Sequence, residues 1–215
     1  MTKQSSPNPW LATRTRSGQE YDAPYAARAV AGMDVHGEAN LIEALLHSEL
    51  YTGLSQGKAT TPYRVVDAGC GTGRMAIELA HRGMEIVGVD LDEVMLTQAR
   101  KKAPQLDWRL GDLSTIDLGQ FFDAIVLAGN VMIYLTPGTE AATLTNMARH
   151  LKPSGLLVAA FELTPPAWSK LTLATYDALA AASGLRLVAR WSTWQQAPWS
   201  QTDNYAISVH IKQKA

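Results

Sequence analysis

The sequence predicts an α/β protein in which helices cover both faces of a mostly parallel sheet. From Arg64 onward, short apolar runs alternate with segments of helical periodicity, an order typical of parallel strands joined by helices. The last two runs, RLVARWSTW at 186–194 and NYAISVHIK at 204–212, have no helix between them. We therefore expect the sheet to end in an antiparallel strand and to bind a ligand at the carboxyl ends of its parallel strands.

The expected strands are apolar runs of five to nine residues. The run FDAIVLAG is apolar almost throughout, as a strand covered on both faces should be. The last run alternates, which places Tyr205, Ile207, Val209 and Ile211 on one face. The strands are predicted at 64–68, 85–90, 106–112, 122–129, 156–163, 186–194 and 204–212.

The expected helices carry start and stop signals. In the segment 92–104, Asp92 can cap the N-terminus, Lys101 and Lys102 suit the C-terminal end and Pro104 stops the helix. Gly83 closes another helix. The remaining helices are predicted at 73–83, 136–155 and 176–184, and most of 21–50 is also expected to be helical.

Composition and charge exclude several classes of function. The 215 residues suit one domain, and the net charge of -1 gives no general attraction to nucleic acid or acidic membranes. The single cysteine, Cys70, cannot form an internal disulfide, and the five histidines are scattered, so no metal site is expected. The longest apolar stretch is interrupted by Asp123 and Asn130. We expect a cytoplasmic protein with no membrane or nucleic-acid partner.

The stretch VVDAGCGTGR places Gly69, Gly71 and Gly73 directly after a predicted strand. Glycines at such a turn let backbone N–H groups and a helix N-terminus approach a ligand closely. A P-loop would need Lys and Ser or Thr after its last glycine, but Arg74 and Met75 follow here. A dinucleotide fingerprint matches only loosely. Asp67 would repel a pyrophosphate and would attract a cationic amine.

Two further acids follow the next two predicted strands. Asp90 can accept hydrogen bonds from both hydroxyls of a ribose; its alternative role is a helix cap, for which Asp92 is better placed. Asp112 can bind the exocyclic amine of adenine, or it can cap the short segment after it. Together these acids predict a ligand with an adenosine and a cationic amino-acid-like tail, which describes S-adenosylmethionine.

Five segments in order resemble the class I S-adenosylmethionine-dependent methyltransferases: VVDAGCGTG, VGVDLD, RLGDL, FDAIVLAGNVMIYL and LKPSGLLVAAF. The resemblance covers about Arg64 to Ile211. It implies a Rossmann-like sheet of seven strands, mostly parallel, in the order 3-2-1-4-5-7-6 with the last strand antiparallel. It also implies S-adenosylmethionine as cofactor and S-adenosylhomocysteine as product.

The resemblance implies roles for residues in the same segments. Asp67, Gly69 and Gly71 would bind the methionine part, Asp90 the ribose and Asp112 the adenine. The flanking residues expected at the cofactor are Cys70, Leu91, Gly111, Leu113, Ala128, Gly129 and Asn130. For Cys70, packing inside the loop is the alternative that we favour.

Residues 1–20 are polar and rich in Ser, Pro and Thr, which predicts a flexible start. The resemblance implies a helical cover of the cofactor site at 21–60 and the cofactor-binding core at 61–215. Tyr21, Tyr25 and Arg28 lie in the cover and could contact the carboxylate tail of the cofactor, or could pack or face water. The candidates for a catalytic role are His36 in the cover and Asn130, which could instead only satisfy its turn. Trp191, Trp194 and Trp199 could wall an acceptor pocket, although such residues more often pack in a core.

The expected reaction is methyl transfer by in-line displacement, for which alignment and exclusion of water can suffice. The segment AGNVMIYL lacks the Asn/Asp-Pro-Pro-aromatic run of amino methylases that act on DNA bases, so we expect a small-molecule acceptor. We also expect a monomer or homodimer. Two alternatives stay open at this point. One is a non-catalytic module that binds the same cofactor, and the other is a nicotinamide-dependent oxidoreductase.

Overall fold

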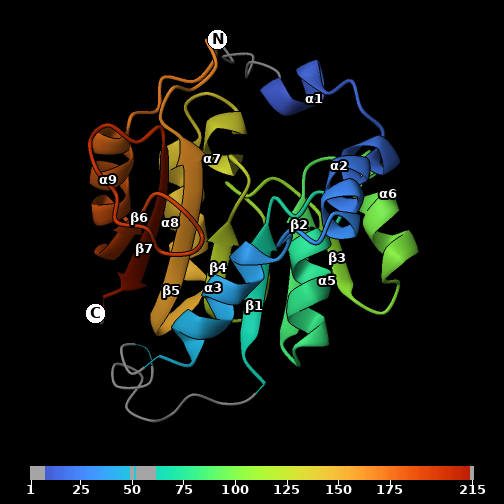
Figure 1. Cartoon of the computed structure of the whole chain (residues 1–215). Coiled ribbons are helices and arrows are strands. Elements are labelled where there is room, and N and C mark those ends of the chain that lie inside the picture. The colour runs from blue at the N-terminus through green and yellow to red at the C-terminus, as the bar shows by residue number, and fades with distance from the viewer. Residues whose placement is uncertain (1–7, 49–50, 52–61, 214–215) are drawn as a thin grey trace.

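The computed structural model describes residues 8–48, 51 and 62–213. Its centre is a seven-stranded sheet in the order β3-β2-β1-β4-β5-β7-β6 (Figure 1). The strands from β3 to β5 run parallel, whereas β7 is antiparallel to both β5 and β6. The predicted fold and strand order are confirmed. The strands are β1 (Arg64–Ala68), β2 (Glu85–Asp90), β3 (Asp107–Leu110), β4 (Phe122–Leu127), β5 (Leu151–Glu162), β6 (Leu185–Trp191) and β7 (Tyr205–Lys212).

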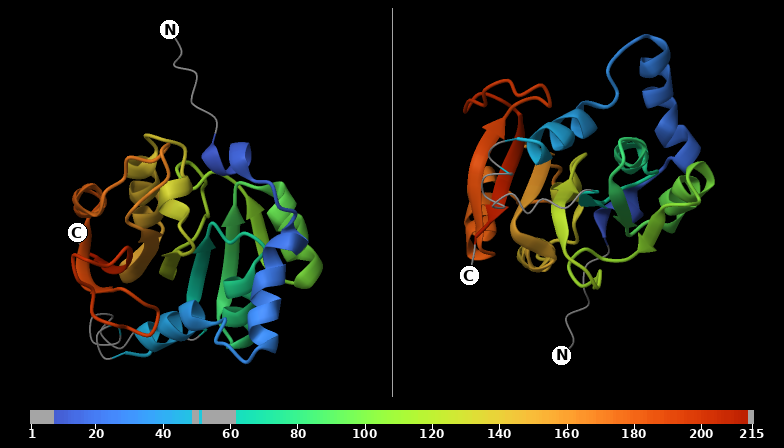
Figure 2. Two further views of the ribbon diagram at one scale, coloured as in Figure 1. Left: turned by 45° about the horizontal axis from the view of Figure 1, so that its top comes forward. Right: turned by 90° about the horizontal axis from the view of Figure 1, so that it is seen from below.

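Helices cover both faces of the sheet (Figure 2). Side chains of α3, α5 and α6 pack into one hydrophobic core, and side chains of α7, α8 and α9 pack into the other. Strands β1, β2, β4 and β5 supply apolar side chains to both cores, which explains the continuous apolar run of β4. The helices are α1 (Pro9–Thr13), α2 (Gly18–Val30), α3 (Gly37–Leu46), α5 (Arg74–His81), α6 (Glu93–Lys102), α7 (Val131–Tyr134), α8 (Glu140–Arg149) and α9 (Leu173–Ala182).

Local signals placed some element ends correctly and missed others. Asp92 caps α6 by accepting a hydrogen bond from the Val94 N–H at 2.9 Å, as predicted. The helix expected at 136–155 ends at Arg149, and β5 already begins at Leu151. Pro153 and Gly155 therefore lie inside an irregular start of β5, where the pairing with β4 shifts register. Such an irregularity accommodates a proline that a regular strand would not.

The N-terminal part is more structured than its composition suggests. Helix α1 and the start of α2 lie within residues 8–20, whereas 1–7 lie outside the described residues. Asn8 caps α1 by accepting from the Leu11 N–H, and Ser17 and Glu20 form a capping box at α2. The segment expected to be helical at 21–50 is broken between α2 and α3, where Gly32 has a φ of +73°. Residues 49, 50 and 52–60 of the predicted cover lie outside the described residues.

None of the helices in the described residues has both the length and the apolar character needed to cross a membrane.

Candidate active site

The glycine loop leads from β1 into α5 and has backbone angles that favour glycine. The φ values are +81° at Gly69, +54° at Gly71 and +81° at Gly73. A Cβ at Gly73 would lie only 2.4 Å from the Trp108 ring, whereas a Cβ at Gly71 would meet no atom within 4 Å. Gly73 is therefore required for packing, and Gly71 leaves open the space that a ligand needs.

An open cavity lies at the carboxyl ends of β1 to β4. It brings together residues from all four of the strand ends, which are far apart in sequence. Most of the predicted cofactor residues line it: Tyr21, Gly69, Gly71, Asp90, Leu91, Gly111, Asp112, Leu113 and Gly129.

Asp90 connects the end of β2 to the glycine loop. Its Oδ2 accepts a hydrogen bond from the Gly71 N–H at 2.7 Å, and its Oδ1 accepts from the Asp92 N–H at 2.8 Å. Asp92 rather than Asp90 caps α6. Asp90 lines the cavity. Burial raises the pKa of the carboxyl, an effect that the backbone N–H groups oppose.

Asp112 also lines the cavity, but its Oδ1 is engaged in a local turn. It accepts hydrogen bonds from the backbone N–H of Ser114 at 2.8 Å and from the Ser114 hydroxyl at 2.7 Å. The structure thus contains the capping contact that we considered as the alternative. Contact with an adenine amine stays a prediction.

Three predicted residues lie behind the cavity wall rather than in it. Asp67 is buried, and its Oδ2 accepts from the Ala76 N–H at 3.1 Å, which anchors the first turn of α5. Cys70 is buried, and burial raises the pKa of its thiol, so it packs as an inert residue. Ala128 packs against the core on the side of α3.

Asn130 satisfies its own turn. It has a φ of +72°, and its Oδ1 accepts a hydrogen bond from the Glu162 N–H at 2.9 Å. The side-chain oxygen therefore joins the loop after β4 to the end of β5. A catalytic role for Asn130 stays a prediction, but this geometry gives the residue a structural task.

Binding of S-adenosylmethionine is expected to tighten as the pH rises through about 7, because burial raises the pKa of Asp67 to about 7. A cationic ligand favours the ionised carboxylate, so the complex lowers this pKa and the affinity increases with pH. The folding stability of the ligand-free protein changes with pH in the opposite direction. Folding raises the pKa of Asp67, so the protonated carboxyl stabilises the folded protein, and this stabilisation is lost as the pH rises toward about 7. Calorimetric titrations from about pH 6 to 8 measure the effect.

Asp67→Asn cannot ionise, so its affinity should be lower and should not change over this pH range. A wild-type affinity that is flat with pH would contradict the expected charge on Asp67.

The structure adds a roof to the cavity that the sequence did not indicate. Helix α1 lies beyond the ends of the parallel strands (Figure 1). Asn8 Nδ2 donates a hydrogen bond to the Tyr134 carbonyl at 3.1 Å, and Trp10 Nε1 donates to Asp92 Oδ2 at 2.9 Å. The Trp10 ring also meets the Tyr134 and Tyr21 rings edge to face. The lining residues missed from the sequence are Asn8, Trp10, Val131, Tyr134, Leu135 and Thr136.

Removing the Trp10 ring is expected to weaken cofactor binding by roughly tenfold, because an aromatic contact and one hydrogen bond are lost at the cavity. The measurement is the Kd of S-adenosylhomocysteine for Trp10→Ala. Trp10→Phe, which keeps a ring but lacks the N–H, should lie between Trp10→Ala and the wild type. Unchanged binding in both variants would show that α1 does not close over the ligand.

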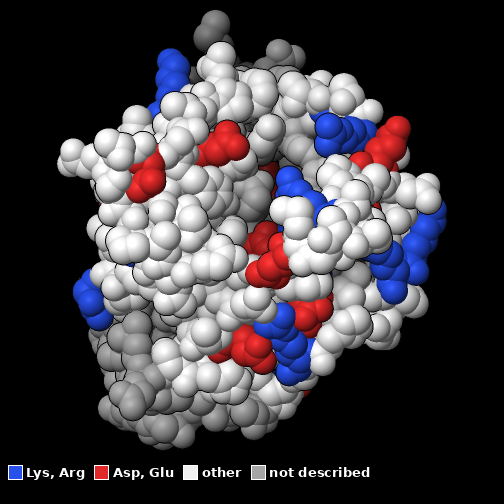
Figure 3. Space-filling view, viewed as in Figure 1, with Lys and Arg blue, Asp and Glu red and all other residues white. Residues whose placement is uncertain are grey.

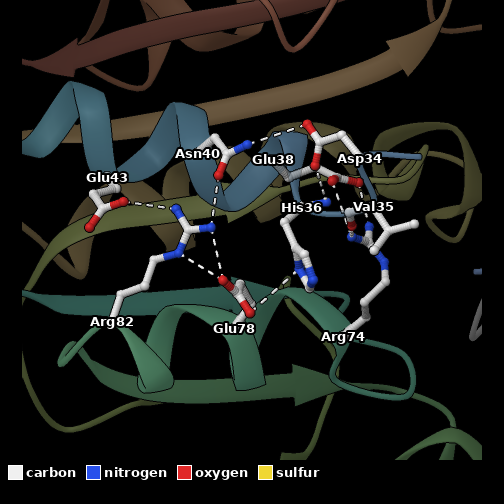
Figure 4. A network of polar contacts seen from close by, with 9 residues as sticks. All are labelled: Asp34, Val35, His36, Glu38, Asn40, Glu43, Arg74, Glu78 and Arg82. Carbon is white, nitrogen blue, oxygen red and sulfur yellow. Dashed lines mark hydrogen bonds and ion pairs between the residues drawn. The ribbon is translucent and has the colours of Figure 1, made fainter. Parts of the chain in front are cut away.

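Arg74 holds the cover on the glycine loop (Figure 4). Its guanidinium pairs with Glu38 at the start of α3 and donates to the Val35 carbonyl in the preceding loop. The guanidinium carbon also lies 4.4 Å from the centre of the Tyr25 ring on α2. One side chain thus joins α2, α3 and the loop between them to the first residue of α5.

The other cover candidates lie around this contact and outside the cavity lining. Tyr25 contacts Arg74, and the guanidinium of Arg28, an exposed residue, is 5.9 Å from the Tyr25 ring. His36 points toward Glu78 on α5, with Nδ1 and Oε2 3.6 Å apart (Figure 4). His36 therefore belongs to the polar contacts between α3 and α5, and a catalytic role for it stays a prediction.

The cavity fits the expected cofactor. Gly71 and Gly129 face open space, so a ligand can approach the backbone there. An acid ends β2, as recognition of ribose hydroxyls requires, and Tyr21 and Trp10 provide apolar surface. Across the described residues, no three His, Cys, Asp or Glu side chains gather as a metal ion would need. Fold and site thus define a nucleoside-binding protein of the Rossmann-like class.

Comparison with known proteins narrows this class. A family model described as "Methyltransferase domain" matches residues 65–155. The putative methyltransferase YqeM of Bacillus subtilis is 36% identical over 102 residues, covering 44% of this chain and 40% of that protein. An amino-sugar enzyme of Streptomyces venezuelae, dTDP-3-amino-3,4,6-trideoxy-alpha-D-glucopyranose N,N-dimethyltransferase, is 32% identical over 139 residues, covering 64% of this chain and 54% of that protein.

A solved structure matches more of the chain. The TehB-like S-adenosylmethionine-dependent methyltransferase from Corynebacterium glutamicum has a TM-score of 0.77 at 29% identity, covering 91% of this chain and 98% of that one. The matches to these two curated relatives span about half of those proteins or less. The matched domain, relatives and solved structure support a class I S-adenosylmethionine-dependent methyltransferase with S-adenosylmethionine as its cofactor.

Proposed function

We propose that this chain transfers the methyl group of S-adenosylmethionine to a small-molecule acceptor. The observation that carries the proposal is the cavity at the strand ends, in which Asp90 and the glycine loop stand beneath the roof formed by α1. Relatives with small acceptors support it: by their names, the enzyme of Streptomyces venezuelae acts on an amino sugar and another, from Rhodobacter capsulatus, on magnesium-protoporphyrin.

Each residue of the cavity would have a role set by its position. Asp90 would hold the ribose, Gly69 and Gly71 would admit the methionine part to the backbone, and Trp10 and Tyr21 would exclude water. Bound S-adenosylmethionine supplies a methyl group that is activated by the positive charge on sulfur. The chain then has to align the acceptor for in-line displacement and accept a proton if the acceptor must lose one.

The test uses purified protein and methyl-labelled S-adenosylmethionine with a cell extract that is separated afterwards into protein, nucleic-acid and small-molecule fractions. We expect label in the small molecules, and no transfer with Asp90→Ala. Label in protein or nucleic acid would refute the acceptor class. Cofactor binding without transfer to any fraction would favour a non-catalytic module, and tighter binding of NAD than of S-adenosylhomocysteine would favour the oxidoreductase.

A further inference from the structure

Glu162 at the end of β5 and Tyr205 at the start of β7 lie on the face of the sheet that the cover packs against. Leu156, Val158 and Ala160 of β5 belong to the core beneath α3, so Glu162 follows them on the same face by alternation. Tyr205 at the start of β7 pairs directly with Glu162 and packs against the same core. The two side chains are therefore neighbours on the face that α3 covers.

Glu162 is tied to the loop that borders the cofactor cavity. Its N–H donates to Asn130 Oδ1 at 2.9 Å, and the Asn130 N–H donates to the Ala160 carbonyl at 3.2 Å. Gly129, one residue earlier, lines the cavity. An acceptor that stands beside Glu162 is thus next to the loop after β4, which borders the cofactor cavity.

Tyr205 and Trp194 pack against the same core, and Glu162 is the strand partner of Tyr205. Burial raises the pKa of the Tyr205 phenol, and the carboxylates of Glu38 and Glu162 and the Tyr25 phenol raise it further, whereas a hydrogen bond with Trp194 lowers it. Figure 3 shows that this face of the molecule is hollowed near its centre, with both acidic and basic side chains at the rim of the hollow. We name the set of Tyr25, Glu162, Trp194 and Tyr205 the cover-side cluster.

The charge of this cluster is not balanced from within. Glu38 pairs with Arg74, so these two charges compensate each other. Glu162, an exposed residue, has no ion-pair partner among residues 8–48, 51 and 62–213. A carboxylate beside the Tyr205 ring, with further aromatic rings on the same side of the sheet, is a combination that favours a cation.

We propose that the acceptor carries a basic amine, which the Glu162 carboxylate pairs with beside the aromatic rings of the cover-side cluster. The proposal rests on the proposed methyl transfer. In the reaction the acceptor ammonium gives one proton to Glu162, and from there to solvent. The freed nitrogen lone pair forms the bond to the methyl carbon, while the electron pair of the broken carbon–sulfur bond stays on sulfur.

The experiment measures binding of two matched pairs of probes: benzylamine with benzyl alcohol, and glucosamine with glucose. Each probe is titrated at about pH 6.5, where the amines are protonated, into protein loaded with S-adenosylhomocysteine. We expect at least one amine to bind roughly tenfold more tightly than its neutral partner, the value of one charge-assisted contact. Glu162→Gln should remove this difference.

Glu85→Gln is the matched control, because Glu85 is an exposed carboxylate at the opposite end of β2. It should keep the preference for the amine. If neither amine binds more tightly than its neutral partner, or if Glu162→Gln keeps the preference, the proposal is overturned. Methyl transfer to small molecules would then still be measured in the labelling experiment, so the two proposals fail separately.

Discussion

Asp90→Ala is expected to abolish measurable binding of S-adenosylmethionine. The carboxylate ends β2 at the cavity, and it also accepts hydrogen bonds from the Gly71 and Asp92 N–H groups at 2.7 and 2.8 Å. Alanine removes the ribose acceptor and loosens the glycine loop at the same time. Loss of charge-assisted hydrogen bonds of about 1.5–3 kcal/mol each predicts an affinity at least roughly 100-fold lower. Calorimetric titration with S-adenosylhomocysteine measures it.

Asp107→Ala provides the matched control, because Asp107 begins the neighbouring strand β3, is exposed and pairs only with Arg109. Its cofactor affinity should equal that of the wild type. Thermal unfolding of both variants without ligand separates a lost contact from a lost fold. If Asp90→Ala kept an affinity within threefold of the wild type, Asp90 would have no part in the site.

Arg74→Met is expected to detach the cover from the glycine loop. The side chain is largely buried, pairs with Glu38, and lies 4.4 Å from the Tyr25 ring. Breaking a largely buried pair leaves Glu38 without its partner, so we expect a loss of about 2 kcal/mol, which is less than for a fully buried pair. For a chain of this size, that corresponds to a fall of roughly 4–8 °C in Tm.

Arg74→Met should lower the stability of the cover locally as well as that of the whole fold. Limited proteolysis should cut Arg74→Met within residues 18–46 before the core unfolds, and S-adenosylhomocysteine should protect it less than the wild type. Arg74→Lys keeps the charge but lacks the planar guanidinium, so its stability should lie between that of Arg74→Met and that of the wild type. Arg100→Met removes the exposed pair with Glu93 and should change Tm very little. An Arg74→Met protein as stable as Arg100→Met would show that Arg74 does not hold the cover.

The sequence alone determined the sheet and the wall of the cavity. The strand order was implied by the resemblance of five ordered segments to a known family. The residues directly after parallel strands share one edge because all carboxyl ends point the same way. Gly69, Gly71, Asp90 and Gly111 could therefore be placed without coordinates, and the structure finds them together. Periodicity and capping signals are local, and they act over a few residues.

Only the tertiary structure decided what closes the site. Trp10 stands in a polar segment with no periodicity, and its hydrogen bond to Asp92 spans 82 positions. The contact of Arg74 with Glu38 spans 36 positions and joins two helices with no shared motif. Asp67 and Asn130 had the expected residue types, yet packing turned them toward α5 and β5. Contacts of this kind depend on how separate elements pack in space, and a pattern read along the chain carries no record of that packing.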